Sequence, residues 1–167
     1  MQEVIDHIWI GSDKDDAEAK RRGYARLVCA KDANGGHREM LGYTTMGAPQ
    51  GPNYLFVQRG NHAAMNLIDV DDPEMIPTEM LDQGLEFAFK QYKSGHKILF
   101  HCNAGHSRSP SCALAFLRTI GEMPHSLKTS MHVFKTLYRP YDPGVGMRKK
   151  LAENWNRWEN IYARVSS

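Results

Sequence analysis

One stretch constrains this chain more than any other: residues 101–109, with the sequence HCNAGHSRS. It follows a short segment, 97–100, that is typical of a buried strand, and it precedes residues 110–117, whose small and apolar side chains predict a helix. In a strand, loop and helix of this kind, successive backbone N–H groups and the helix N-terminus point toward one place and attract an anion. The stretch therefore predicts an anion-binding loop.

Two side chains of this loop indicate which anion it binds. Cys102 and Arg108 are separated by five residues, and Gly105 between them can take a backbone angle that other residues avoid. Cysteines at a helix N-terminus beside a guanidinium have thiol pKa values of roughly 3.5–7.5 instead of about 8.5, so we expect a thiolate at neutral pH. The planar fork of Arg108 can hold two oxygens of a phosphoryl group. A nucleophile and a phosphate clamp on one loop favour phosphoryl chemistry.

The stretch resembles the HC(x5)R(S/T) signature of cysteine-dependent protein phosphatases, and its G-x-S-R-S ending is most similar to the dual-specificity family. The resemblance implies an α/β fold: one domain, residues 1–167, with a central, mostly parallel sheet of about four to five strands flanked by helices. It also implies that Cys102 is the nucleophile, that Ser109 hydrogen-bonds the departing thiolate, and that His101 orients the loop and tunes the thiol from behind. The implied phosphate-binding residues are Asn103, Ala104, Gly105, His106, Ser107 and Arg108.

Alternative interpretations of this loop explain less. A buried core cysteine with a surface arginine does not explain why the strand breaks into a polar loop and a helix. The G-x-x-x-x-G-K-[ST] pattern of P-loop nucleotidases does not occur.

A phosphatase of this kind also needs an acid that protonates the leaving oxygen. The resemblance implies an Asp upstream of the cysteine, and the cluster Asp69, Asp71 and Asp72 lies there. Asp71, 31 residues before Cys102, fits the register best, and Asp72 is the alternative. Asp69 alternates with apolar neighbours in an expected strand, 65–70, and is expected to face another way. A solvated turn that caps the next helix remains an alternative for the whole cluster.

Length and composition place the chain among ordinary globular domains. Its 167 residues suffice for one core, and a net charge of +2 does not favour a nucleic-acid or membrane partner. Three cysteines do not form a disulfide framework, and the first residues lack the pattern of a signal peptide. We expect a cytoplasmic monomer without metal or cofactor.

The remaining segments are interpreted in chain order. Strands are expected near 4–10, 24–30 and 65–70, with a polar helix from 12 or 13 to 22 after the first. Helices are expected at 77–95, from 109, from about 126, and in a last segment carrying Trp155 and Trp158 as core anchors. Residues 31–53 are rich in Gly, Pro, Asn and Thr and predict an irregular loop, which we interpret as an insertion around 31–62 that forms a hairpin with 54–57.

Cys29 permits two interpretations. In some relatives a cysteine at the end of the corresponding strand forms a reversible disulfide with the catalytic one, so Cys29 is a candidate redox partner of Cys102. A buried, inert cysteine is the other interpretation.

The resulting prediction is a phosphatase acting on phosphotyrosine and on phosphoserine or phosphothreonine of proteins through a cysteinyl-phosphate. The alternatives are the same chemistry on a phosphoinositide, a phosphoglucan or an RNA 5′ end, and a phosphate-binding pseudophosphatase.

Overall fold

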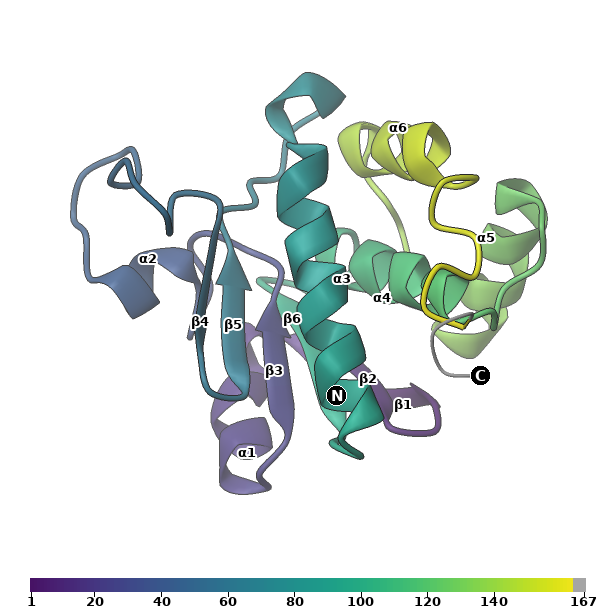
Figure 1. Cartoon of the computed structure of the whole chain (residues 1–167), viewed down its shortest axis with the longest axis horizontal. Coiled ribbons are helices and arrows are strands. Elements are labelled where there is room, and N and C mark those ends of the chain that lie inside the picture. Colours follow the sequence, from purple (N-terminus) through teal and green to yellow (C-terminus); the bar gives the residue numbers. More distant parts are fainter. Residues whose placement is uncertain (164–167) are drawn as a thin grey trace.

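Six strands form one sheet in the computed structural model, which describes residues 1–163 (Figure 1). The strands are β1 (Gln2–Ile5), β2 (Ile8–Ser12), β3 (Ala25–Val28), β4 (Phe56–Arg59), β5 (His62–Met65) and β6 (Ile98–Cys102). Their spatial order is β1-β2-β6-β3-β5-β4. The longer helices are α3 (Thr78–Lys93), α4 (Arg108–Thr119), α5 (Leu127–Leu137) and α6 (Val145–Asn154), and the shorter ones are α1 (Asp16–Arg21) and α2 (His37–Leu41).

The expected α/β sheet is confirmed, but it has more strands than predicted. The four inner strands β2, β6, β3 and β5 are parallel, while β1 and β4 pair antiparallel at the two edges. The first strand was expected to be continuous, yet a turn at His7, where φ is +71°, folds it into the β1–β2 hairpin. The division of the first expected strand into β1 and β2 accounts for the sixth strand.

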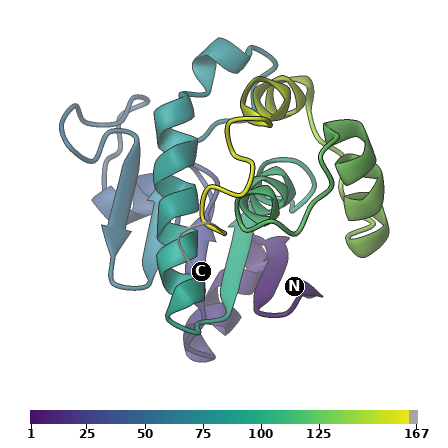
Figure 2. The ribbon, with the colours of Figure 1, turned by 45° about the vertical axis from the view of Figure 1, so that its right-hand side comes forward.

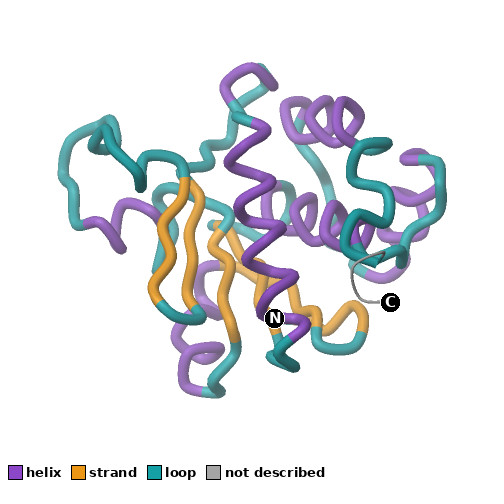
Figure 3. Tube along the Cα trace, viewed as in Figure 1, coloured by secondary structure: helices purple, strands orange, loops and turns teal. Residues whose placement is uncertain are grey.

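The insertion does not pair as predicted. Residues 54–57 were expected to form a hairpin with the preceding loop, but β4 pairs with β5, which follows it, through a turn at Gly60 with φ of +63°. The loop itself contains the short helix α2, which ends at Gly42 in the left-handed conformation. Figure 3 shows the rest of this connection running as a long loop to β4.

The strand predicted for residues 65–70 lies earlier in the chain, at His62–Met65. After Met65 the chain leaves the sheet because its backbone groups have other partners. The carbonyl of Leu67 accepts hydrogen bonds from the Lys31 amide at 2.9 Å and from the Arg108 guanidinium at 3.1 Å. Residues 66–70 therefore form a connection that reaches the anion-binding loop.

Alternation along β6 assigns the two faces of the sheet. Ile98, Phe100 and Cys102 belong to the large core under α3 and α4, whereas Leu99 packs in a smaller cluster with Ala19 of α1. Helices α3 and α4 lie side by side over one face (Figure 2). His101, between Phe100 and Cys102, consequently faces α1.

The C-terminal segment confirms the two predicted core anchors. Trp155 and Trp158 are 3% and 0% exposed. The helix that was expected to carry both ends at Asn154, so the tryptophans lie in the turns that follow it.

Candidate active site

The sulfur of Cys102 lies at the end of β6 and receives hydrogen bonds from the loop that follows. The backbone N–H of Gly105 donates to Sγ at 3.3 Å, and the hydroxyl of Ser109 lies 3.2 Å from Sγ. Ser109 is fully buried, and its single hydrogen can point either to the sulfur or to the carbonyl of Gly11, 3.3 Å away. Directed at the sulfur, it stabilises a thiolate.

Arg108, the first residue of α4, is held so that its guanidinium borders the loop. Its Nη1 donates to the carbonyl of Leu67 at 3.1 Å and its Nη2 donates to Oδ1 of Asn103 at 2.8 Å. The fork is thus oriented before any anion binds, which lowers the cost of ordering it on binding.

The connection between α5 and α6 braces the other side of the loop. Tyr138 donates to the carbonyl of Gly105 at 2.8 Å, and the backbone N–H of Asp142 donates to the carbonyl of His106 at 2.8 Å. Two residues further on, the N–H of Gly144 donates to Oγ of Ser107 at 2.9 Å. Three consecutive loop residues are therefore fixed by one segment.

These elements enclose a cavity of about 330 Å³. Its lining consists of Asp69, Cys102, Asn103, Ala104, His106, Ser107, Arg108, Asp142 and Gly144. Five of the six predicted phosphate-binding residues line it. Gly105 is not among the lining residues; its N–H donates to the sulfur and its carbonyl accepts from Tyr138. A thiol at the base and a guanidinium at the side can receive a tetrahedral phosphate monoester.

The three carboxylates of the acidic segment occupy different places. Asp69, expected to face away, lines the cavity, because residues 66–70 are not a strand. Asp71 is exposed and does not belong to the lining. Asp72 caps the short helix η2 (Pro73–Met75) by accepting a 3.0 Å hydrogen bond from the N–H of Glu74.

His101 is held from the opposite face of the sheet. Its Nε2 lies 2.9 Å from Oδ1 of Asp16, and its Nδ1 lies 3.5 Å from the carbonyl oxygen of Cys102. The other oxygen of Asp16 accepts from Nη1 of Arg26 at 2.9 Å.

Cys29 lies beside the same loop but in a different environment. It is a free, fully buried thiol whose pKa is raised well above the usual value, first by burial and then by the neighbouring thiols of Cys112 and Cys102. Its backbone N–H donates to the carbonyl of His101 at 2.7 Å.

Residues 1–163 contain no group of three or more His, Cys, Asp or Glu side chains placed to hold a metal ion. Within this part of the chain, no helix is both long and apolar enough to cross a membrane.

No protein-family model matches the chain. Human dual specificity protein phosphatase 22 is 22% identical over 153 residues, which are 92% of this chain and 72% of that protein. The mouse protein of the same name is 21% identical with the same coverage. The match to these phosphatases spans nearly the whole chain. The sequence is thus similar to dual-specificity phosphatases.

Solved structures of the dual-specificity phosphatase family share the fold. The crystal structure of DUSP15 superposes with a TM-score of 0.66 at 18% identity, covering 99% of this chain and 94% of that one. Human DUSP28 gives a TM-score of 0.61 at 17% identity over the full length of both chains. At sequence identities of 17% and 18%, this similarity shows a common fold only.

Some residues of the site could not be predicted from the sequence. Tyr138 follows the apolar pattern of the helix expected from about 126, and Asp142 has no motif around it. Asp16 is 85 residues from His101 in the chain, and no local pattern connects the two. Asp69 could have been identified from its place in the acidic cluster. The strand predicted for residues 65–70, however, directed its side chain away from the cavity.

Proposed function

We propose that the chain is a cysteine-dependent phosphatase that hydrolyses phosphotyrosine and phosphoserine or phosphothreonine in proteins. One observation carries the proposal: Cys102 and Arg108 line the same 330 Å³ cavity. The Gly105 N–H and the Ser109 hydroxyl reach the sulfur from inside the loop. This arrangement supports attack on a bound phosphate.

In the first step, the Cys102 thiolate attacks phosphorus and the bond to the leaving oxygen breaks. The fork of Arg108 and the loop amides hold the equatorial oxygens, where charge is redistributed in the transition state. The leaving oxygen takes a proton from an acidic group. The products of this step are a free hydroxyl compound and a cysteinyl-phosphate.

In the second step, water attacks the phosphorus and gives its proton to the same acidic group, now a carboxylate. The sulfur–phosphorus bond breaks, inorganic phosphate leaves, and the Ser109 hydroxyl stabilises the returning thiolate. The cycle restores the starting protonation state.

Two carboxylates compete for the role of acid. Asp71 has the register that the family resemblance favours, and catalytic hydrogen bonds in unliganded structures often form only when substrate binds. Asp69 already lines the cavity. We propose Asp71 as the donor of the proton to the leaving oxygen, with Asp69 as the alternative.

The test is hydrolysis of para-nitrophenyl phosphate in the presence of a chelator, with Cys102→Ser and Cys112→Ser compared to the wild type. Both cysteines are 3% exposed, but Cys112 lies on α4 outside the cavity lining and serves as the matched control. We expect turnover in the wild type and the control and none in Cys102→Ser. Turnover that persists in Cys102→Ser would refute the proposal.

The substrate class is tested with phosphotyrosine and phosphoserine peptides of one sequence, together with an inositol phosphate. Comparable kcat/KM values for the two peptides support dual specificity. A clear preference for the inositol phosphate would reassign the substrate.

A further inference from the structure

A second hollow, of about 310 Å³, lies between the long connection after α2 and the short helix η2. We call it the flanking groove. Its apolar lining consists of Tyr54, Leu55, Ile68, Met75 and Pro77. In Figure 1 the arrow of β5 points up, and both the connection and η2 lie above it. The flanking groove is therefore at the edge of the sheet where the parallel strands end, which is also the edge of the anion-binding loop.

The flanking groove and the catalytic cavity share one wall. Ile68 lines the groove, and the next residue, Asp69, lines the cavity. Just before them, the carbonyl of Leu67 accepts hydrogen bonds both from the amide of Lys31, a groove residue, and from the guanidinium of Arg108, a cavity residue. Because consecutive Cα atoms are about 3.8 Å apart, a peptide that leaves the cavity can reach the groove within a few residues.

Exposed apolar side chains gather at this groove. The large ones within residues 1–163 are Met46, Tyr54 and Met75, which are 90%, 36% and 55% exposed. Tyr54 and Met75 line the groove, and Met46 directly precedes Gly47, which also lines it. Apolar side chains that are gathered on a surface mark sites where other molecules bind. The groove therefore offers apolar contacts that the folded chain does not use itself.

The groove also has a polar group that suits a peptide backbone. Nδ2 of Asn66 donates to the carbonyl of Tyr54 at 3.0 Å, which fixes the amide at the groove. Its Oδ1 can accept a hydrogen bond from the backbone N–H of a ligand. Apolar walls with a small number of placed polar groups are typical of ligand sites.

The charges at the groove favour a neutral or basic ligand. Glu74 is exposed and lines the groove, and the exposed Asp71 and Asp72 precede it in the chain. Lys31 is the basic residue of the lining, but its ammonium donates to the carbonyl of Met46. Carboxylates therefore dominate the rim and repel an acidic peptide.

We propose that the flanking groove is a substrate subsite, which binds an apolar side chain a few residues from the phosphorylated residue of a protein substrate, with a basic side chain beside it at Glu74. The proposal rests on the proposed function in taking a phosphoprotein as the substrate. The shared wall of residues 67–69 supports a ligand that occupies cavity and groove together. The apolar lining and the acidic rim determine the side chains that it carries.

The first experiment moves one leucine through a phosphotyrosine peptide of alanine and serine, over the four positions on either side of the phosphotyrosine. The readout is kcat/KM. We expect leucine at one position, or at two neighbouring positions, to raise kcat/KM about five- to tenfold, because the groove removes its apolar surface from water. Equal values for all the peptides would overturn the proposal.

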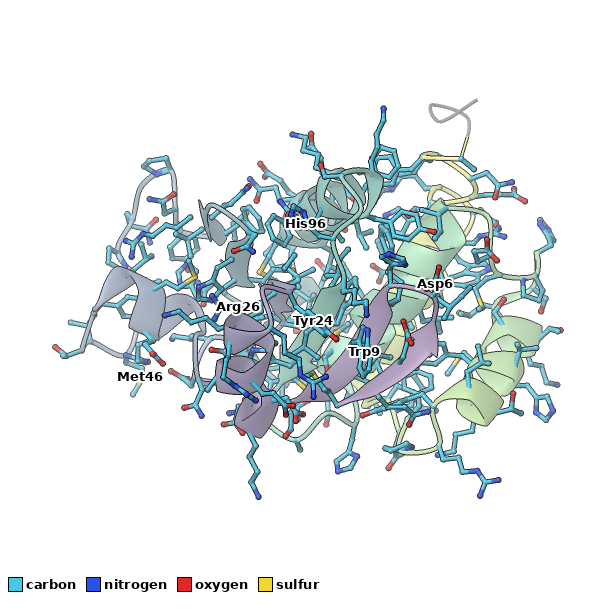
Figure 4. The ribbon with its side chains drawn as sticks, turned by 90° about the horizontal axis from the view of Figure 1, so that it is seen from below. Asp6, Trp9, Tyr24, Arg26, Met46 and His96 are labelled. Atoms are coloured by element: carbon cyan, nitrogen blue, oxygen red, sulfur yellow. The ribbon has the colours of Figure 1, made fainter. Side chains whose placement is uncertain are left out.

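The second experiment removes an apolar side chain from the groove. Met75→Ser is compared with Met46→Ser, the same substitution at a residue outside the lining. Met46, labelled in Figure 4, lies at the outer edge of the molecule beside α2. We expect Met75→Ser to lower kcat/KM about fivefold for the best leucine peptide, mainly through KM, and Met46→Ser to match the wild type.

Two reference substrates separate loss of the subsite from a general disturbance of the protein. Met75→Ser should leave kcat/KM unchanged for the peptide with serine in place of the leucine, and for para-nitrophenyl phosphate, which has no flanking residues. The effects of the two changes are then coupled, as expected for side chains in contact. An equal loss with the leucine and serine peptides would contradict the subsite.

The charge preference is tested by placing lysine or glutamate next to the leucine. We expect the lysine peptide to have about twice the kcat/KM of the glutamate peptide or more, a difference that salt reduces. Glu74→Gln should diminish it, whereas Glu122→Gln, which removes an exposed carboxylate after α4, should not. A preference for glutamate would refute the role of Glu74.

A binding measurement distinguishes failure of the subsite from failure of the proposed function. Fluorescence anisotropy reports binding of the leucine and serine phosphopeptides to Cys102→Ser, with and without Met75→Ser. Tighter binding of the leucine peptide, lost with Met75→Ser, supports the subsite even if the wild type hydrolyses no phosphate ester, a result that would refute the proposed function alone. Hydrolysis without any preference for leucine would refute the subsite alone. A dimer in sedimentation velocity that Met75→Ser dissociates would assign the groove to a second copy of the chain and overturn the proposal.

Discussion

The phenolic hydroxyl of Tyr138 donates a 2.8 Å hydrogen bond to the carbonyl oxygen of Gly105. Gly105 has a φ of +78°, and a Cβ there would lie 2.8 Å from the carbonyl oxygen of Gly11, so the loop can curl at this point only through glycine. The bond fixes the loop in the orientation that turns the Gly105 N–H toward the sulfur.

Tyr138→Phe removes this bond and leaves a buried carbonyl without its partner. We expect a loss of about 1–3 kcal/mol in the free energy of unfolding, measured in urea, and a higher KM for para-nitrophenyl phosphate. Burial raises the pKa of Tyr138 to about 12, so the hydroxyl remains a donor and the effect should not vary between pH 6 and 9.

Tyr43→Phe is the control for Tyr138→Phe. The hydroxyl of Tyr43 bonds Nδ1 of buried His37 at 2.9 Å, so this variant loses a hydrogen bond at a site away from the loop. Tyr43→Phe should lower the free energy of unfolding and leave the KM for para-nitrophenyl phosphate unchanged. An unchanged KM in Tyr138→Phe would mean that Tyr138 does not position the loop.

The sequence predicts this loop better than it predicts the elements that hold it. Residues 101–109 combine a strand end, a glycine and a helix start within one window, so local rules suffice for Cys102 and Arg108. Tyr138 and Asp16 act across the fold, where no local rule applies. The same limit explains why the strand predicted for residues 65–70 was wrong. These residues follow a strand pattern, but the carbonyl of Leu67 accepts hydrogen bonds from Lys31 and Arg108 and not from a neighbouring strand.

The identity of the acid is tested with Asp69→Asn, Asp71→Asn and Asp72→Asn. A general acid contributes about 10²–10⁴-fold, and most for poor leaving groups. We expect Asp71→Asn to lower kcat strongly for phenyl phosphate and less for para-nitrophenyl phosphate. Asp72→Asn should have little effect, because asparagine also caps helices. If Asp69→Asn shows the leaving-group dependence instead, the proton comes from Asp69.

Gly146 allows α6 to approach the acidic segment. A Cβ at Gly146 would lie 2.0 Å from the carbonyl oxygen of Val70, whereas a Cβ at Gly144 would meet nothing closer than 3.6 Å. Gly146→Ala must therefore displace residues 70–71. We expect a lower kcat for phenyl phosphate, by about tenfold or more if the acid is misplaced by an ångström.

Gly47→Ala is the control for Gly146→Ala. Gly47 lies outside the cavity lining and has no positive φ, and a Cβ there would meet nothing within 4 Å, so activity and stability should stay near the wild type. Equal losses in both variants would indicate that the loss in Gly146→Ala does not come from the displacement of residues 70–71.

The redox role of Cys29 is tested by peroxide treatment and disulfide mapping. The raised pKa of Cys29 keeps it a thiol at neutral pH, and thiols attack oxidised sulfur far more slowly than thiolates. We expect no link between Cys29 and Cys102, and the same loss of activity in Cys29→Ser as in the wild type. A mapped Cys29–Cys102 disulfide would establish the resolving role.

The buried His37 makes stability depend on pH. Burial is the main cause that lowers its pKa, and the Lys31 charge acts in the same direction, against the hydrogen bond to the carbonyl of Asn53. The unfolded chain therefore binds a proton more readily near the usual value of 6.5 than the folded chain does. The contribution of His37 is complete above that pH and is lost as the pH falls through the lowered value.

We expect the free energy of unfolding to fall between pH 6.5 and 5, and to fall less steeply in His37→Gln. The lowered pKa of His62 contributes in the same direction, so part of the slope should remain in this variant. His96→Gln is the matched control, since His96 is exposed (Figure 4) and should leave the slope unchanged. Urea unfolding at pH 5, 6 and 7 measures all three proteins. An equal slope in His37→Gln and the wild type would show that this histidine is not the group that titrates.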